Sequence, residues 1–255
     1  MLVGVLFLTS GLAIEIGYQL GRRRRVRANA AWSTHIGAIQ DALLAVLALL
    51  LGFTFSLALQ RYDSRSEAVV DEANAIGTAY LRAALLPDAV RGEVQERLRS
   101  YLDARVQEST VPLSQQAARQ ALLAQAGQQQ AALWRLVRQA AALDNSPVTT
   151  GLFVEALNNL IDAYGRRNAA LNRHVPEAVM LLLFGVFLVT WWVVGYIAGS
   201  SGHRPSAVAY ITLVLMLVVI FIIVDLDRPR RGVIEISHAS LTELQAAIAA
   251  EGEVP

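Results

Sequence analysis

The hydrophobic residues of this chain are concentrated in four stretches, each about as long as a helix that crosses a membrane. A transmembrane helix needs about 20 mainly apolar residues, because the hydrocarbon core of a bilayer is about 30 Å thick and each helical residue rises about 1.5 Å. Apolar runs also form buried helices in soluble proteins, but four such runs in a chain of 255 residues favour a membrane protein. We therefore predict transmembrane helices at residues 2–20, 36–59, 178–199 and 207–224.

The first apolar stretch has to be distinguished from a cleaved signal peptide. A signal peptide carries its positive charges before the apolar run. Here the charges follow the run, at residues 22–25 and at Arg27. This order favours a helix that is retained in the membrane.

The distribution of arginines predicts the orientation, since basic residues favour short cytoplasmic loops. The linker after the first stretch holds five arginines and no acid, and the segment 200–206 adds Arg204 and His203. We therefore expect both segments in the cytoplasm of a multi-pass protein of the bacterial inner (cytoplasmic) membrane. Both termini and the large middle segment would then be extracytoplasmic. Arginines near the other membrane ends, several of them mixed with acids, weaken this bias.

The segment between the second and third apolar stretches has a helical pattern throughout and equal numbers of arginines and acids. Nothing interrupts the second membrane helix before Pro87, so we expect it to continue out of the bilayer up to that residue. Two further helices are predicted at 90–106 and 114–143. A fourth is expected to begin near Thr150 and to continue past Pro176 into the third membrane helix.

These patterns predict an all-α membrane protein with four transmembrane helices and a helical extramembrane domain inserted between the second and third. Membrane helices 2 and 3 are expected to extend out of the bilayer. The predicted parts are transmembrane helices 1 and 2 with the Arg-rich linker at 1–60, the extramembrane domain at 61–177, transmembrane helices 3 and 4 at 178–225, and a C-terminal tail with a short helix at 226–255.

Composition narrows the chemistry that the chain can perform. Hydrophobic residues make up 55% of the chain, its net charge is +1 and it contains no cysteine. The small net charge provides no basic field for nucleic acid, and the lack of cysteine excludes disulfides and thiolate catalysis. The four histidines lack metal-ligand spacing, and neither a nucleophile elbow nor a phosphate-binding glycine loop occurs. We therefore expect no enzymatic activity, no cofactor, no metal and no nucleic-acid partner.

Two acidic residues, Glu15 and Asp41, lie within predicted membrane helices. Ionisable groups inside a bilayer are costly, so they usually face protein, water or one another. Both residues lie towards the Arg-rich ends of adjacent antiparallel helices, so they could belong to an ion path or gate. The alternative, which the pattern favours, pairs them with the linker arginines or with His35 and gives them a role in helix packing.

One face of the second membrane helix has the pattern of a pore lining. It is polar at its ends, and its leucines would form a constriction that gates by dewetting in a symmetric oligomer. The face consists of Gln40, Leu44, Leu47, Leu51, Thr54 and Ala58. The alternative is ordinary packing against lipid or against other helices.

Arg61 and Arg65 continue this face beyond the apolar stretch. Rings of arginine at the mouth of a pore would attract anions. The alternative is pairing with Asp63 or Glu67 along the same helix, which stabilises a helix only slightly.

Several short motifs lie at the end of the second membrane helix, after it, and beside the third and fourth. They are Gly52-Phe53-Thr54-Phe55, Gln60-Arg61-Tyr62-Asp63, Glu72-Ala73-Asn74-Ala75-Ile76-Gly77-Thr78, Leu85-Leu86-Pro87, Asn172-Arg173-His174-Val175-Pro176 and Leu226-Asp227-Arg228-Pro229. With these motifs the chain resembles the bacterial bestrophin-like family of membrane proteins over residues 36–245. The resemblance implies a relation to bestrophins, which are pentameric anion channels with four membrane helices per subunit. The implied partners are the lipid bilayer, further copies of the chain and anions.

Two functions of different classes follow from these observations. The leading hypothesis is a homo-oligomeric membrane channel that conducts anions. The alternative is a non-conducting membrane scaffold or sensor whose helical domain binds a partner. Oligomeric state distinguishes the two, because a pore built from one helix per subunit requires a closed ring.

Overall fold

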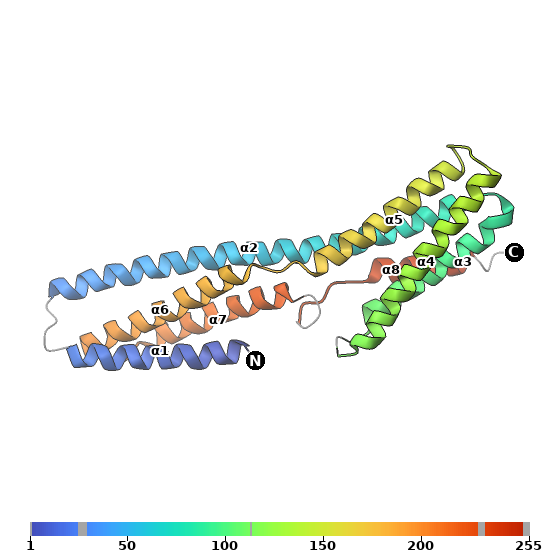
Figure 1. The fold of residues 1–255 in the computed structure, drawn as a ribbon. Coiled ribbons are helices and arrows are strands. Elements are labelled where there is room, and N and C mark those ends of the chain that lie inside the picture. The colour runs from blue at the N-terminus through green and yellow to red at the C-terminus, as the bar shows by residue number, and fades with distance from the viewer. Residues whose placement is uncertain (1, 25–29, 113, 229–232, 252–255) are drawn as a thin grey trace. The chain divides into compact units, whose positions relative to one another are not determined.

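The computed structural model of the chain describes residues 2–24, 30–112, 114–228 and 233–251. These residues form eight α-helices and no strand, which confirms the all-α prediction (Figure 1). The helices are α1 (Leu2–Arg24), α2 (Ala30–Ala83), α3 (Asp88–Thr110), α4 (Gln116–Leu143), α5 (Thr150–Leu171), α6 (Glu177–Ser201), α7 (Ala207–Asp227) and α8 (Ala239–Glu251).

Four of these helices, α1, α2, α6 and α7, are long and apolar enough to cross a membrane. They contain the four apolar stretches of the sequence. Large apolar side chains such as Leu8, Leu181 and Val208 lie exposed on their surfaces. Water would disfavour so much uncovered apolar surface, whereas lipid accommodates it.

Prolines determine two of the helix boundaries. As predicted, α2 continues well beyond its apolar stretch and ends at Ala83, shortly before Pro87. The predicted continuation of the last middle helix into the third membrane helix is wrong, because α5 ends at Leu171 and α6 begins at Glu177. Pro176 lies at the start of α6, where its ring removes the N–H that a continuous helix needs and disfavours a helical conformation for the residue before it.

The chain divides into two compact units. The first unit, Met1–Arg61 and His174–Arg228, contains α1, the apolar part of α2, α6 and α7. The second unit, Tyr62–Arg173 and Pro229–Pro255, contains the remainder of α2 together with α3, α4, α5 and α8. Helix α2 therefore contributes to both units.

In the first unit, α1 and α6 pack against each other through glycines. A Cβ atom added to Gly17 would lie 2.1 Å from the carbonyl oxygen of Trp192, and one added to Gly21 would lie 2.1 Å from that of Tyr196. Because the residue numbers rise together along both helices, α1 and α6 run in the same direction.

Helix α6 contributes glycines to the same contact. A Cβ atom at Gly195 would lie 2.1 Å from the carbonyl oxygen of Ile14, and one at Gly199 would lie 2.1 Å from that of Tyr18. Both helices thus carry the Gly-x-x-x-Gly spacing with which membrane helices bring their backbones into contact. The hydrophobic pattern of the sequence did not predict this contact.

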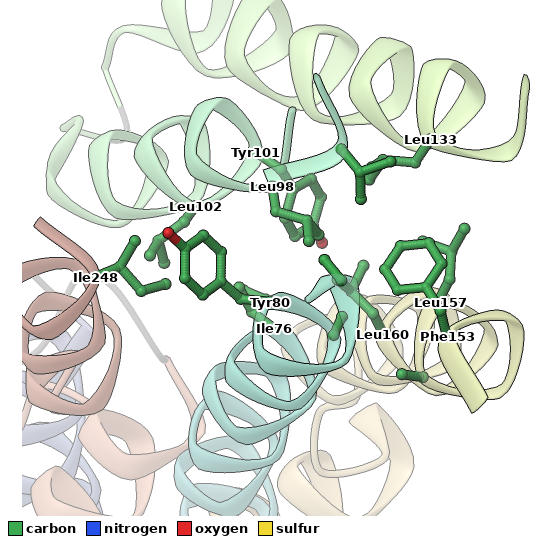
Figure 2. Packing of buried hydrophobic residues seen from close by; sticks show 14 of the residues in the cluster. Ile76, Tyr80, Leu98, Tyr101, Leu102, Leu133, Phe153, Leu157, Leu160 and Ile248 are labelled. Carbon is green, nitrogen blue, oxygen red and sulfur yellow. The ribbon is translucent and has the colours of Figure 1, made fainter. Parts of the chain in front are cut away.

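The second unit has an apolar core to which every one of its helices contributes (Figure 2). The outer part of α2 places Val69, Ala73, Ile76 and Tyr80 in this core, as the helical period predicts. The other helices bury Leu98, Leu102, Leu133, Phe153, Leu157, Leu160, Leu241 and Ile248. This unit therefore has an apolar core that its own helices cover, although some apolar side chains, such as Leu81 and Leu143, stay exposed on its surface.

Candidate functional site

The structure buries most of the predicted pore face of α2 within the chain itself. Gln40 and Leu44 are half-buried, and the other four residues of the face are buried: Leu47, Leu51, Thr54 and Ala58. Side chains that their own chain covers are not available to a channel formed between chains. Their burial therefore supports the packing interpretation of this face.

The opposite face of α2 is uncovered in the first unit. Val46, Leu49 and Phe53 are 47%, 57% and 62% exposed. Their spacing places them on one stripe of the helix, which the exposed residues Ser56 and Gln60 continue. We refer to these five residues as the uncovered stripe.

Arg61 and Arg65 lie in different surroundings. Arg65 is buried; its Nε donates to the carbonyl oxygen of Ala170 at 3.2 Å and its Nη2 to that of Arg173 at 2.5 Å. These carbonyls lie at and just beyond the end of α5, where acceptors lack helical partners, so Arg65 caps that helix end. Arg61 is half-buried, and its Nε has no acceptor among the described residues. A role in attracting anions stays a prediction for Arg61.

Glu15 is paired with an arginine that the sequence did not suggest. Its Oε2 lies 2.6 Å from Nη1 of Arg204, between α6 and α7. Two of the linker arginines, Arg25 and Arg27, lie outside the described residues. The Arg204 guanidinium also lies 4.3 Å from the centre of the Tyr18 ring. Asp41 lies exposed on α2. For Glu15, this geometry supports a role in helix packing.

A cavity of about 460 Å³ lies where α6 begins and α7 ends. Its polar lining comes from His174, Glu177, Asp227 and Arg228. Asp227 is engaged here, because its Oδ1 accepts from the backbone N–H of Val175 at 2.8 Å. No three His, Cys, Asp or Glu side chains gather as metal ligands anywhere in the described part of the chain.

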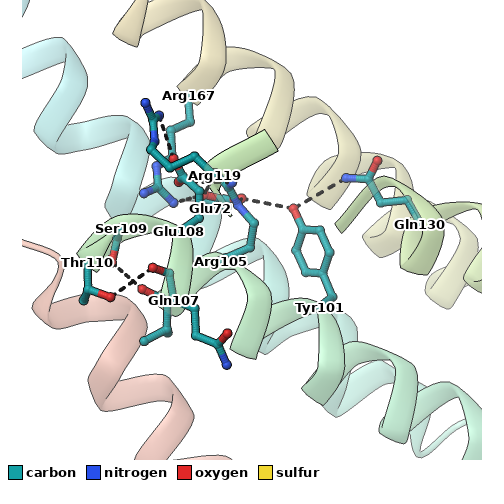
Figure 3. A network of polar contacts seen from close by, with 11 residues as sticks. Glu72, Tyr101, Arg105, Gln107, Glu108, Ser109, Thr110, Arg119, Gln130 and Arg167 are labelled. Carbon is teal, nitrogen blue, oxygen red and sulfur yellow. Dashed lines mark hydrogen bonds and ion pairs between the residues drawn. The ribbon is translucent and has the colours of Figure 1, made fainter. Parts of the chain in front are cut away.

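A buried network of charges, which the sequence patterns did not predict, lies in the second unit (Figure 3). At its centre is Glu72 of α2, which is 0% exposed. Arg105 of α3 donates from Nε to its Oε1 at 2.7 Å and from Nη2 to its Oε2 at 3.2 Å. The Tyr101 hydroxyl donates to Oε1 at 3.0 Å, and Nη1 of Arg167 on α5 donates to Oε2. One carboxylate thus connects α2, α3 and α5.

A second buried carboxylate extends the network to α4. Glu108 accepts from Nη1 of Arg105 at 3.4 Å and from Nη2 of Arg119 at 2.9 Å. Gln130, also on α4, donates to the Tyr101 hydroxyl at 3.5 Å. Four helices, α2 to α5, therefore meet at this network.

Charges at this depth are stable only when they are paired. Burial by itself lowers the pKa of Arg105, but the neighbouring carboxylate of Glu72 outweighs that effect and raises it above its usual value. The Tyr164 ring adds a cation–π contact, with its centre 4.9 Å from the Arg105 guanidinium. Removing one partner of a buried pair costs about 3–5 kcal/mol, because the other charge is left buried and uncompensated. The network therefore strongly constrains how α2 to α5 pack.

Tyr101 provides a pH-dependent test of the network. Burial, reinforced by the negative charge of Glu72, raises the pKa of Tyr101 well above its ordinary value of about 10. The unfolded chain releases this proton near pH 10, whereas the folded chain retains it. The contribution of the Tyr101 hydroxyl to stability is therefore complete below about pH 10 and falls as the pH rises further. We expect Tyr101→Phe to leave the tyrosinate absorbance titration of the folded protein unchanged. In denaturant, the wild type should ionise one more tyrosine than the variant. A smaller titration amplitude in the folded variant would contradict this placement of the hydroxyl.

The sequence did contain a signal for the network. Glu72 falls on the apolar stripe of outer α2, next to Val69, Ala73 and Ile76, where a solvated acid is not expected. A charge on a buried stripe predicts a buried partner. It does not identify that partner, because Arg105 and Arg167 lie far away along the chain.

Comparisons with known proteins agree with this fold. The sequence model of the bestrophin-like domain matches residues 9–241, while no curated protein matches the chain. The crystal structure of a variant of a bacterial bestrophin homologue from Klebsiella pneumoniae is similar, with a TM-score of 0.65 and 15% identity over 98% of this chain and 99% of that chain. A second variant of that homologue gives a TM-score of 0.70 and 16% identity over 99% of this chain and 98% of that chain. A third crystal structure, of a membrane protein, has a TM-score of 0.71 and 16% identity over 99% of this chain and 98% of that chain. The structures show a shared fold, and the match of the domain to almost the whole chain shows that this protein belongs to the bestrophin-like family.

Proposed function

We propose that this protein is a homo-oligomeric membrane channel that conducts anions, and that the uncovered stripe of α2 lines its pore. The proposal rests mainly on the exposure of this stripe. Val46, Leu49 and Phe53 are exposed on a candidate span whose other face is covered by the chain. A closed ring of copies would bring these stripes together around one axis. Membership of the bestrophin-like family supports a channel. The pore face therefore moves from the side of Leu47 and Leu51 to the opposite side of the same helix.

The stripe itself is uncharged, so the preference for anions rests on the family resemblance and on Arg61, which follows the apolar stretch on the other face of the helix. Residues 42–60 carry no charge, and Arg61 follows directly. A ring of apolar side chains narrows a pore and controls its wetting, whereas arginines at its end raise the local concentration of anions. Phe53 is the most exposed large apolar residue among those of α2 whose exposure is described in the first unit, so we place the constriction there.

The same proposal includes the placement in the membrane. The four candidate spans cross the bacterial inner membrane, and the second unit lies outside the bilayer because its own helices cover its apolar core. The Arg-rich linker and Arg204 favour the cytoplasm, which makes the second unit extracytoplasmic. The family analogy suggests five copies in the ring.

Because the chain contains no cysteine, the proposal can be tested by introducing one cysteine at a time. In Phe53→Cys protein in liposomes, we expect a negatively charged methanethiosulfonate reagent to reduce chloride efflux by about tenfold or more, since a ring of negative charge repels anions. A positively charged reagent of similar size should reduce the efflux much less. Chloride efflux is measured with a halide electrode, and potassium efflux serves as the selectivity control.

Phe55→Cys is the matched control, because it changes the same residue type on another face of the same helix. Leu47→Cys controls for the buried face. Neither variant should lose efflux on modification. Modification that blocks efflux at Phe55 or Leu47 but not at Phe53 would refute the pore face. No efflux of either ion from folded, inserted wild-type protein would favour the non-conducting scaffold or sensor.

A further inference from the structure

The buried network of the second unit contains donors that no protein acceptor satisfies. Arg167 is 1% exposed, and its Nε and Nη2 have no hydrogen-bond acceptor among the described residues. The Nε of Arg119 is likewise buried without an acceptor there. Buried N–H groups of native proteins are almost always bonded, and those of a charged group are the most costly to leave unbonded. These donors therefore require an acceptor other than the described protein atoms, either an ordered water or a bound anion.

The charges of the network favour an anion as the missing acceptor. Its ion pairs join the guanidiniums of Arg105, Arg119 and Arg167 to the carboxylates of Glu72 and Glu108. Arginine stays protonated in proteins, so these groups carry one positive charge in excess. Arg119 is partly exposed and lies at the edge of the network, whereas Arg167 is deeply buried. The same network thus has both an excess of positive charge and N–H donors without an acceptor.

We propose that the network binds a small monovalent anion of halide size, held by Nε and Nη2 of Arg167 with Arg119 beside it. One negative charge balances the network, and a halide accepts hydrogen bonds from several directions without needing donors in return. The depth of Arg167 favours a small ion over phosphate or a carboxylate ligand. This ion is bound, not conducted. It lies among α2 to α5 of the second unit and stabilises their packing, a role separate from permeation along the uncovered stripe.

The first test measures thermal unfolding of the full chain in detergent, with chloride replaced by gluconate at constant ionic strength. Above the dissociation constant, we expect each tenfold increase in chloride to raise Tm by about 3–6 °C. Arg167→Gln should abolish this dependence. Arg166→Gln should retain it, because Arg166 is exposed and its replacement removes the same charge one residue away. Equal chloride dependence in the wild type and Arg167→Gln would overturn the proposal.

Arg119→Gln addresses the possibility that Arg167→Gln does not fold. Because Arg119→Gln removes the excess positive charge but leaves the donors of Arg167 in place, it should shift the chloride midpoint to higher concentration without abolishing the effect. An unchanged midpoint would exclude Arg119 from the site and count against the proposal.

A second test requires no variant. Crystals of the wild type grown in bromide should show an anomalous peak within hydrogen-bond distance of Nε or Nη2 of Arg167. Peaks only at exposed arginines, which would mean an adventitious ion only, would overturn the proposal. Both tests report binding, so failure of chloride efflux and failure of this site are distinguishable.

Discussion

Replacing Glu72 with glutamine is expected to lower the free energy of unfolding by about 3–5 kcal/mol. The substitution keeps the shape of the side chain but removes the negative charge that two buried guanidiniums share, those of Arg105 and Arg167. Both positive charges then lose their counterion in the interior, and the Tyr101 hydroxyl loses a charged acceptor. For a chain of this size the loss corresponds to a fall in Tm of about 6 °C or more.

Thermal unfolding followed by far-UV circular dichroism in detergent measures this effect. Glu67→Gln is the matched control, because Glu67 lies on the same helix and is exposed. Its replacement should change stability by less than about 0.5 kcal/mol. Similar melting temperatures for the two variants would mean that the ion pairs of Glu72 do not hold α2 to α5 together.

The second large effect is expected where α1 and α6 cross. Gly195→Ala adds one methyl group whose carbon would lie 2.1 Å from the carbonyl oxygen of Ile14. A backbone carbonyl at such a distance cannot turn away as a flexible side chain can, so the two helices must separate along their contact. We expect a loss of about 3 kcal/mol, at the upper end of the cost of overpacking.

Gly185→Ala on the same helix is the control, because an added Cβ there meets nothing within 4 Å. Alanine is the better helix former by about 1 kcal/mol, so this variant should be neutral or slightly more stable. The two substitutions are chemically identical, but only Gly195→Ala is predicted to lower the stability. Size-exclusion chromatography after graded heating measures the folded fraction of each. Equal survival of both variants would refute the close approach of α1 and α6.

Local sequence patterns predict where the helices of this protein form, but they do not predict which helices contact one another. The break between α5 and α6 follows from a local rule, because Pro176 is incompatible with the continuous helix that the apolar pattern predicted there. The Gly-x-x-x-Gly spacing of Gly17 with Gly21 and of Gly195 with Gly199 was visible too. Spacing alone does not show that these two pairs meet.

The pore face of α2 shows a different limit. Helical period correctly places Leu47, Leu51 and Thr54 on one face, and Leu49 and Phe53 on another. In a membrane helix both faces are apolar, because lipid and the protein interior favour the same residues. Hydrophobicity therefore does not distinguish a covered face from an uncovered one, and only the packed structure reveals which of them is buried.

By itself, the sequence determined that this protein is helical and that four of its helices suit a membrane. Those properties follow from the composition and the helical periodicity of continuous segments, because a bilayer requires long apolar helices. Only the tertiary structure decided which residues meet. Arg204 pairs with Glu15, and Arg105 and Arg167 converge on Glu72, across separations that no local pattern encodes. The physical reason is that a buried charge requires a partner, while the position of that partner depends on how whole helices pack.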